Sequence, residues 1–303
     1  FYSPLKACDK YLKFVFLTGI TKFTQLSIFS ELNNIKNVSM MPQFADICGI
    51  SKEELTDQLG DYIDALAEAY DCSHDEMLTR LTYRYDGYHF TWPSPDIFNP
   101  FSLINAFSDR ELNSYWFGSG TPTFLIEMLR RFNVAPAQIG GNRVGKNGFD
   151  APAERLTSIM PLLYQSGYLT IKHYDPETES YTLDIPNTEI RIGLMESLLP
   201  GYVYDRAGEW KPILGDMALL IRKGKMEEAL QYLKTFLASI PQCDNTNYEG
   251  HYQQMLYVIF TLLGYYVEVE VRTATGRIDL VIKTSTTIYL MELKINKSAE
   301  KAQ

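Results

Sequence analysis

The hydrophobic period changes near the C-terminal end of the chain, and this change constrains the fold more than any other sequence feature. A helical period extends over residues 248–263, and Gly264 then supplies a C′ residue that can end the helix. Three strands of period two are predicted after it, at residues 266–271, 277–282 and 287–295. With another helix expected from Ser298, the order α-β-β-β predicts an α/β core in this part of the chain.

The residues before this core predict a mainly helical region. A capping box over residues 51–54 opens one helix, and Ser73, with Glu76 three residues later, opens a second. Further helices are predicted at residues 101–108, 121–132, 188–199, 211–222 and 225–239. Residues 11–20 are predicted to form a buried strand, because the run is short, aromatic and β-branched.

A helix over residues 153–166 is followed by two predicted strands, at 168–174 and 181–185, which is the pattern of a winged-helix unit. Such a unit can bind DNA through its helix. Here Arg155 is the only cation of that helix and the hairpin is acidic, so packing against neighbouring domains is the favoured interpretation.

The expected fold class is therefore α/β, as an α+β multidomain chain with a helical and winged-helix middle region before the α-β-β-β core. The expected segments are residues 1–50, a helical region at 51–150 with an aromatic loop, a winged-helix-like unit at 151–205 and the core at 206–303. The aromatic loop, which includes His89 and Trp92, could stack on bases, but an ordered core loop is the favoured interpretation.

Composition limits the class of protein. The 303 residues are 46% hydrophobic and 21% charged, which indicates a globular chain long enough for two or three compact units. No run approaches 18 apolar residues and no signal-peptide core lies near the start, so we expect no membrane span and a cytoplasmic location. Four scattered cysteines argue against zinc sites and disulfides.

The charge distribution favours one region for contact with nucleic acid. The net charge is −9, so any such contact must use a local basic surface. Residues 272–303 hold six Lys and Arg against three acids, a local charge of +3. We therefore expect nucleic acid to approach this segment.

Asp279, Glu292 and Lys294 are the strongest candidates for chemistry. The period of two puts Glu292 and Lys294 on the same face of one predicted strand, roughly 7 Å apart. If Asp279 faces them from the neighbouring strand, two carboxylates converge beside a lysine, a set that suits Mg²⁺ with several bound waters. Such a metal activates water for phosphodiester hydrolysis, and Lys294 would stabilise the developing charge.

Alternating Glu292 and Lys294 are also typical of the solvent-exposed face of an antiparallel strand. The neighbouring residues are apolar, however: Met291, Leu293 and Ile295 share one face, and Leu290 shares the other with the charged pair. Charges cost more on so apolar a strand than on an ordinary surface. This cost favours the functional interpretation.

Three strings resemble the PD-(D/E)XK nuclease superfamily: Gly276-Arg-Ile-Asp-Leu-Val-Ile282, Ile288-Tyr-Leu-Met-Glu-Leu-Lys294 and Ser298-Ala-Glu-Lys-Ala302. The resemblance implies a restriction-endonuclease-like core in which Asp279 and Glu292 bind Mg²⁺ or Mn²⁺ and Lys294 assists catalysis. It also implies Glu249, at the start of the preceding helix, as a further metal ligand.

Other strings resemble bacterial AAA-ATPase-like proteins that carry this nuclease domain C-terminally: Phe14-Val-Phe-Leu-Thr-Gly-Ile-Thr-Lys-Phe23, Ser27-Ile-Phe-Ser-Glu-Leu-Asn33, Tyr85-Asp-Gly-Tyr-His-Phe90, Asn99-Pro-Phe-Ser102 and Leu163-Tyr-Gln-Ser-Gly-Tyr-Leu169. The resemblance implies that residues 1–50 are the C-terminal remnant of an ATPase-like domain. It also implies that the nuclease core is C-terminally incomplete at Gln303 and that ATP binds only in a missing N-terminal part.

The string Gly140-Gly-Asn-Arg-Val-Gly-Lys-Asn147 approaches a P-loop but lacks the hydroxyl and the strand–helix setting that a P-loop needs. We expect a flexible loop there and no binding of ATP by residues 1–303.

The expected function is a metal-dependent nuclease coupled in the full-length protein to an AAA-type ATPase, with nucleic acid, DNA in the first place, bound at the C-terminal domain. The alternatives are an NTP-driven regulatory or switch protein that uses a degenerate nuclease fold as a binding platform, and a purely structural or partner-binding module. The sequence does not determine the oligomeric state.

Overall fold

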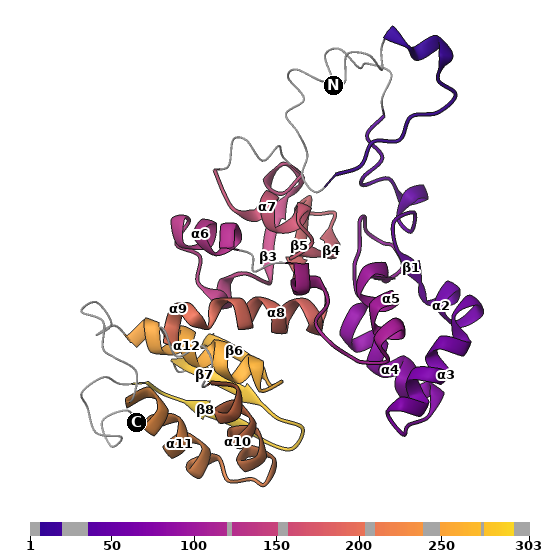
Figure 1. Cartoon of the computed structure of the whole chain (residues 1–303). Helices are drawn as coiled ribbons and strands as arrows, with labels where there is room; N and C mark the ends of the chain where they lie inside the picture. Colours follow the sequence, from indigo (N-terminus) through magenta and orange to yellow (C-terminus); the bar gives the residue numbers. More distant parts are fainter. Residues whose placement is uncertain are drawn as a thin grey trace. The chain divides into compact units, whose positions relative to one another are not determined.

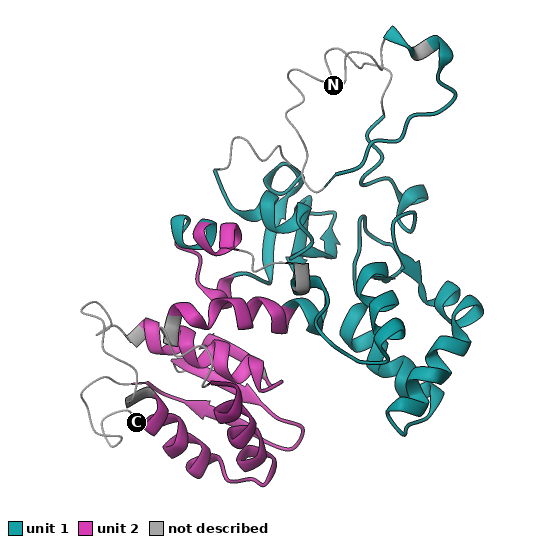
Figure 2. Ribbon diagram, in the orientation of Figure 1, with its two compact units in different colours: residues 1–119, 128–132, 139–190 teal, residues 120–127, 133–138, 191–303 magenta. Residues whose placement is uncertain are grey.

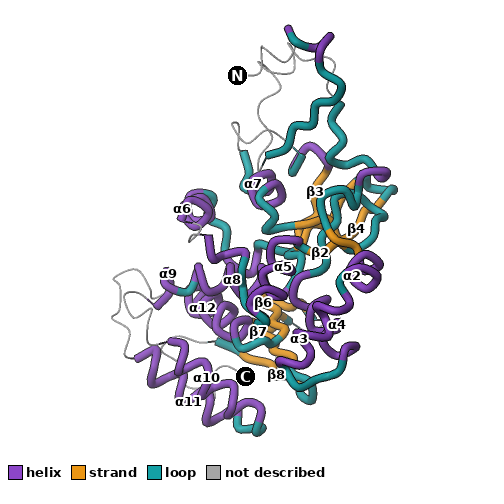
Figure 3. The backbone as a smooth tube through the Cα atoms, turned by 45° about the vertical axis from the view of Figure 1, so that its right-hand side comes forward, coloured by secondary structure: helices purple, strands orange, loops and turns teal. Residues whose placement is uncertain are grey.

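The computed structural model describes residues 7–19, 36–119, 123–150, 157–203, 210–238, 249–273 and 276–293. Two compact units divide the chain, unit 1 with residues 1–119, 128–132 and 139–190 and unit 2 with residues 120–127, 133–138 and 191–303 (Figure 2). Strands of the described residues form three small antiparallel sheets (Figure 3). The finer division into four segments stays a prediction.

Unit 1 contains a helical region built around one apolar core. Its helices are α2 (Lys52–Gln58), α3 (Gly60–Ala69), α4 (His74–Tyr85) and α5 (Pro100–Asp109), beside the short paired strands β1 (Ile50–Ser51) and β2 (Ile97–Phe98). The core side chains come from each helix and from β2, and include Leu55, Ile63, Leu66, Met77, Leu81, Tyr85, Phe98 and Leu103. Burial of these side chains stabilises the region.

The helices of this region begin where the sequence predicted, but one predicted helix is divided into two. Ser51 Oγ accepts the Glu54 N–H at 3.1 Å while Glu54 Oε2 accepts the Ser51 N–H at 2.9 Å, which is the predicted capping box. The single helix expected from this start breaks at Leu59 into α2 and α3. Gly60 follows the break, and glycine is among the weakest helix formers.

The middle of unit 1 is a three-stranded sheet of order β3-β5-β4, made of β3 (Asn142–Gly145), β4 (Thr170–Asp175) and β5 (Ser180–Asp184). Helix α7 (Met160–Gln165) precedes the hairpin, and residues 153–156 of the longer helix predicted over 153–166 lie outside the described residues. The flexible loop expected over residues 140–147 is wrong, because residues 142–145 pair with β5. The winged-helix assignment stays a prediction.

The buried strand expected at residues 11–20 is also wrong for the part that the structure describes. After a 3₁₀ turn at Asp9–Tyr11, residues 12–19 form neither helix nor strand. Phe14 is 82% exposed, and its ring stacks on Phe16. A strand needs a hydrogen-bonded neighbour, and the described residues provide none for this segment.

Unit 2 holds the α-β-β-β order expected from the change of period. Its elements are α10 (Trp210–Arg222), α11 (Met226–Ala238), α12 (Glu249–Leu262), β6 (Tyr266–Arg272), β7 (Arg277–Lys283) and β8 (Ile288–Met291), with β7 central in the sheet. The short helix α9 (Pro200–Val203) precedes them, and α6 (Thr123–Arg131) and α8 (Thr188–Leu198) include residues of both units.

The central strand of unit 2 is covered on both faces. Leu280, Val281 and Ile282 are consecutive on β7 and all buried, although neighbouring residues of a strand point to opposite faces. In Figure 1, α12 lies on one side of this sheet and the α10–α11 pair on the other. None of the described helices has both the length and the hydropathy that a bilayer span requires.

Candidate functional site

Asp279 lies on β7, and its carboxylate is directed at the segment that follows β8. Asp279 Oδ2 accepts a hydrogen bond from the backbone N–H of Leu293 at 2.9 Å. The last pair of the β7–β8 register is Leu280 with Met291, so Asp279 and Glu292 stand opposite each other one step further on. Residues opposite each other on antiparallel strands project to the same face of a sheet. The register therefore allows the two carboxylates to converge.

Glu292 lies just beyond β8, because the strand ends at Met291 rather than at residue 295 as the sequence predicted. Its side chain is exposed, and Leu290 on the same strand is 63% exposed. For Glu292, the argument that a charge is costly on so apolar a strand is therefore wrong. An exposed Glu292 can still bind a cation, because such sites keep several waters around the metal.

Lys294 lies outside the described residues, as does the helix predicted from Ser298. Glu249 is the first residue of α12, and only its backbone is described. The structure thus brings Asp279 close to the segment of Glu292 and leaves the other two candidates untested.

The described donors suit a hard divalent cation. Mg²⁺ binds through one or two carboxylates and keeps water in its other positions, and Asp279 and Glu292 offer two carboxylates. Within the described ranges, no three His, Cys, Asp or Glu side chains are grouped so that they could hold a metal ion. A third protein ligand would therefore have to come from residues such as Glu249, whose side chain is not described.

The backbone at Asp279 departs from a regular ladder, which the sequence did not predict. The β6–β7 register passes from Val269 with Leu280 to Val271 with Ile278 and omits the pair between them, Glu270 with Asp279. Glu270 has φ of +53°, in the left-handed region that non-glycine residues rarely adopt. The Asp279 carbonyl accepts a hydrogen bond from Gln253 Nε2 on α12 instead, at 2.7 Å.

Substitution of Glu270 tests this irregularity. Glu270→Val should lower the free energy of unfolding by about 1–2 kcal/mol, since a β-branched residue tolerates the left-handed region worst. Glu270→Gly should not lower it, because glycine adopts this region freely, and the exposed ion pair of Glu270 with Arg277 contributes little. Urea denaturation of the two variants measures the difference. Equal losses for both would contradict a left-handed residue at this position.

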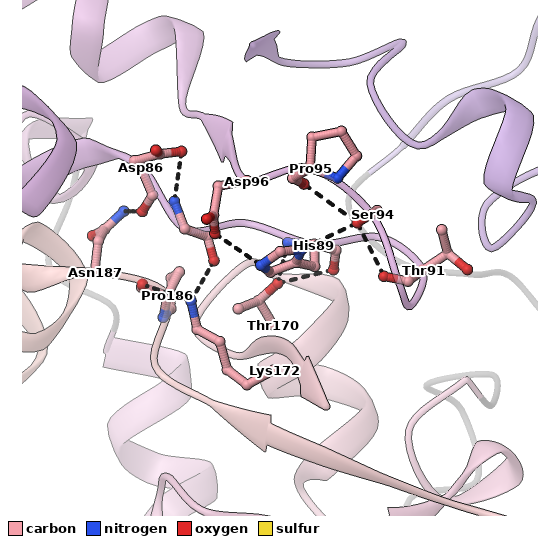
Figure 4. A network of polar contacts seen from close by, with 11 residues as sticks. Asp86, His89, Thr91, Ser94, Pro95, Asp96, Thr170, Lys172, Pro186 and Asn187 are labelled. Atoms are coloured by element: carbon pink, nitrogen blue, oxygen red, sulfur yellow. Dashed lines mark hydrogen bonds and ion pairs between the residues drawn. The ribbon is translucent and has the colours of Figure 1, made fainter. Parts of the chain in front are cut away.

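A second polar network lies in unit 1, where the aromatic loop meets the β4–β5 hairpin (Figure 4). Thr170 Oγ1 accepts the His89 N–H at 2.7 Å and donates to the His89 carbonyl at 2.9 Å. Lys172 Nζ donates to the carbonyls of Gly87 and Pro186, at 2.6 and 3.1 Å. The loop is thus ordered and fixed to the hairpin, in agreement with the favoured interpretation from the sequence.

Gly87 is required at this junction. Its φ is +97°, and a Cβ at this position would lie 2.5 Å from the Pro186 carbonyl oxygen. Any larger residue would therefore separate the loop from the hairpin.

His89 has the neighbours of a Ser–His–Asp triad but not its chemistry. Its Nε2 lies 2.8 Å from Asp96 Oδ1, and its Nδ1 lies 3.1 Å from Ser94 Oγ. The Ser94 hydroxyl also lies 3.1 Å from the Thr91 carbonyl, so this backbone oxygen competes with the imidazole for its single proton. Burial lowers the pKa of His89. Since both ring nitrogens are occupied, we interpret His89 as a structural clamp.

Comparison with known proteins agrees with the C-terminal pattern. Residues 247–303 match the family model of the PD-(D/E)XK nuclease superfamily. The chain is 31% identical over 304 residues to the "Uncharacterized protein in vnfD 5′ region" of Azotobacter chroococcum mcd 1, with 97% of this chain and 56% of that protein covered. The chain thus spans little more than half the length of the curated relative it matches. No solved structure matches the chain.

Proposed function

Because residues 247–303 are a PD-(D/E)XK nuclease superfamily domain, we propose that the protein is a metal-dependent nuclease that hydrolyses phosphodiester bonds. The observation that carries this proposal is the hydrogen bond from the Leu293 N–H to Asp279 Oδ2. It directs the Asp279 carboxylate to the residue that lies between the other two candidates, Glu292 and Lys294.

Each candidate residue has a separate role in this proposal. Asp279 and Glu292 hold Mg²⁺ or Mn²⁺, with Glu249 as a further ligand. A metal bound there would supply Lewis acidity, which lowers the pKa of a water ligand so that it can lose a proton and serve as the nucleophile. Lys294 stabilises the charge that develops on the phosphate.

Nuclease activity is tested with supercoiled plasmid and with single-stranded DNA and RNA, each in Mg²⁺, in Mn²⁺ and in EDTA. Cleavage that requires the metal and stops in EDTA supports the proposal. Binding of nucleic acid without cleavage in either metal would instead support the degenerate binding platform. The coupling to an AAA-type ATPase and the preference for DNA rest on the sequence resemblance, and the family match begins only at residue 247.

Nucleic acid should contact the C-terminal segment, residues 272–303, whose local charge of +3 contrasts with the −9 of the chain. Because this contact is mostly electrostatic, affinity should fall roughly tenfold or more between 50 and 200 mM salt. Crosslinking followed by peptide mapping identifies the contacted residues. Crosslinks confined to the β4–β5 hairpin would show that the winged-helix-like unit, and not this segment, binds nucleic acid.

A further inference from the structure

Asp279 is held at two points by groups from two other segments of unit 2. Its carbonyl accepts from Gln253 Nε2 on α12 at 2.7 Å, and its carboxylate accepts from the Leu293 N–H at 2.9 Å. The β6–β7 register passes over the position of Asp279 and Glu270. The backbone position of Asp279 therefore depends on a side chain of α12 as well as on the ladder.

Gln253 is well suited to fix that position. It is 8% exposed, in a stretch of α12 where Met255, Val258 and Ile259 are also buried. A buried amide keeps one geometry because its alternatives leave a donor or an acceptor without a partner. The helix packs on β6 and β7, so the amide is held firmly against the sheet.

We propose that Gln253 is a positioning residue for Asp279: its amide holds the Asp279 backbone through the carbonyl, and so directs the carboxylate to the segment of Glu292. The consequence for catalysis rests on the proposed nuclease function. The positioning itself does not, because it concerns only the direction of the Asp279 side chain. Removal of a group that hydrogen-bonds to a metal ligand typically lowers metal affinity or activity by 10–100-fold.

The positioning is measured through the Leu293 amide, which bonds to the Asp279 carboxylate. Gln253→Met keeps an unbranched side chain of similar length but has no N–H donor. The rate of hydrogen exchange at Leu293 should rise about tenfold relative to the wild-type protein, the equivalent of one lost hydrogen bond. Gln254→Met is the matched control. It removes a neighbouring glutamine whose Oε1 accepts from the Ala137 N–H at 3.1 Å, and it should leave Leu293 unchanged.

Gln253→Glu distinguishes a hydrogen-bonding role of Gln253 from a role in packing alone, because only the former makes the exchange rate at Leu293 depend on pH. The protonated carboxyl can donate to the Asp279 carbonyl as the amide does, whereas the ionised form has only acceptors. At pH 8, where the carboxyl is ionised, the exchange rate at Leu293, taken as a ratio to wild type at the same pH, should be about tenfold higher, and this ratio should fall towards one as the pH is lowered until the carboxyl takes up its proton. This comparison within one protein also decides the question if Gln253→Met does not fold.

Metal binding and activity separate this inference from the nuclease proposal. In the intact protein, Gln253→Met should weaken Mn²⁺ binding in calorimetry about tenfold and lower kcat about tenfold, with KM for plasmid DNA unchanged. Normal Mn²⁺ affinity and kcat in this variant, beside an inactive Asp279→Asn, would overturn the positioning role and leave the nuclease intact. If the wild-type protein neither binds Mn²⁺ nor cleaves, the nuclease proposal fails, and the Leu293 exchange ratios alone support or overturn the positioning.

Discussion

Asp279→Asn should reduce Mg²⁺-dependent cleavage by about a thousandfold, to the background of the assay, with little change in stability. The asparagine amide oxygen can still accept the Leu293 N–H, as Asp279 Oδ2 does at 2.9 Å, so the segment after β8 keeps its anchor. What the variant loses is the negative charge that a hard divalent cation requires. Initial rates of plasmid nicking and thermal unfolding curves measure the two effects separately.

Asp279→Ala is a less clean variant, because it removes the Leu293 hydrogen bond together with the charge and should lower stability by about 1 kcal/mol. Glu268→Gln is the matched control. Glu268 lies on β6 of the same sheet, and its carboxylate pairs with Lys283 at 3.1 Å, so activity should be unchanged. Lys294→Ala should slow cleavage but keep metal binding. Cleavage that persists in Asp279→Asn would remove this residue from the site.

Asp86→Asn should stabilise the protein at pH 8 and have little effect at pH 4. Burial, aided by the nearby Asp96, raises the pKa of Asp86 from 3.8 to about 6, against the opposing effects of the Gly87 N–H and Lys172. The folded state therefore holds this proton more tightly than the unfolded state does. The resulting contribution to the free energy of unfolding is fully present below pH 3.8 and is lost as the pH rises through 6. The ionised group costs up to about 3 kcal/mol at pH 8, which asparagine avoids.

Urea denaturation of Asp86→Asn and wild type at the two pH values tests this expectation. Asp175→Asn provides a control of opposite sign. Hydrogen bonds from Thr178 and from the Glu177 N–H lower the pKa of Asp175, so its stabilising effect is present above its unfolded-state pKa and is lost as the pH falls through the folded-state value. Asp175→Asn should thus destabilise at pH 8 and not in strong acid. An Asp86→Asn effect of equal size at pH 4 and pH 8 would contradict the proposed ionisation.

Part of the candidate site could be predicted from the sequence, and part of it could not. The period of two and the strand order led to the expectation that Asp279 faces Glu292, and the observed register allows it. Left-handed Glu270 and the bond from Gln253 had no signal in the sequence, because each depends on how α12 and β6 pack against β7. The exposure of Leu290 was missed for a related reason, since periodicity gives the face of a residue but not what covers that face.

By itself the sequence determined those local elements of this protein whose hydrogen-bond partners are close along the chain. The capping box at Ser51 and the strands of unit 2 are such elements. Each follows from a pattern of residues only a few positions apart in the sequence. The tertiary structure decided which segments remain unpaired, as around Phe14, and which find distant partners. His89 meets Thr170 at a separation of 81 residues, and the buried Glu189, whose pKa burial raises, accepts the Trp116 N–H at 3.0 Å across 73 residues. Such contacts depend on the packing of whole elements, because a polar group loses its water only when another part of the chain covers it.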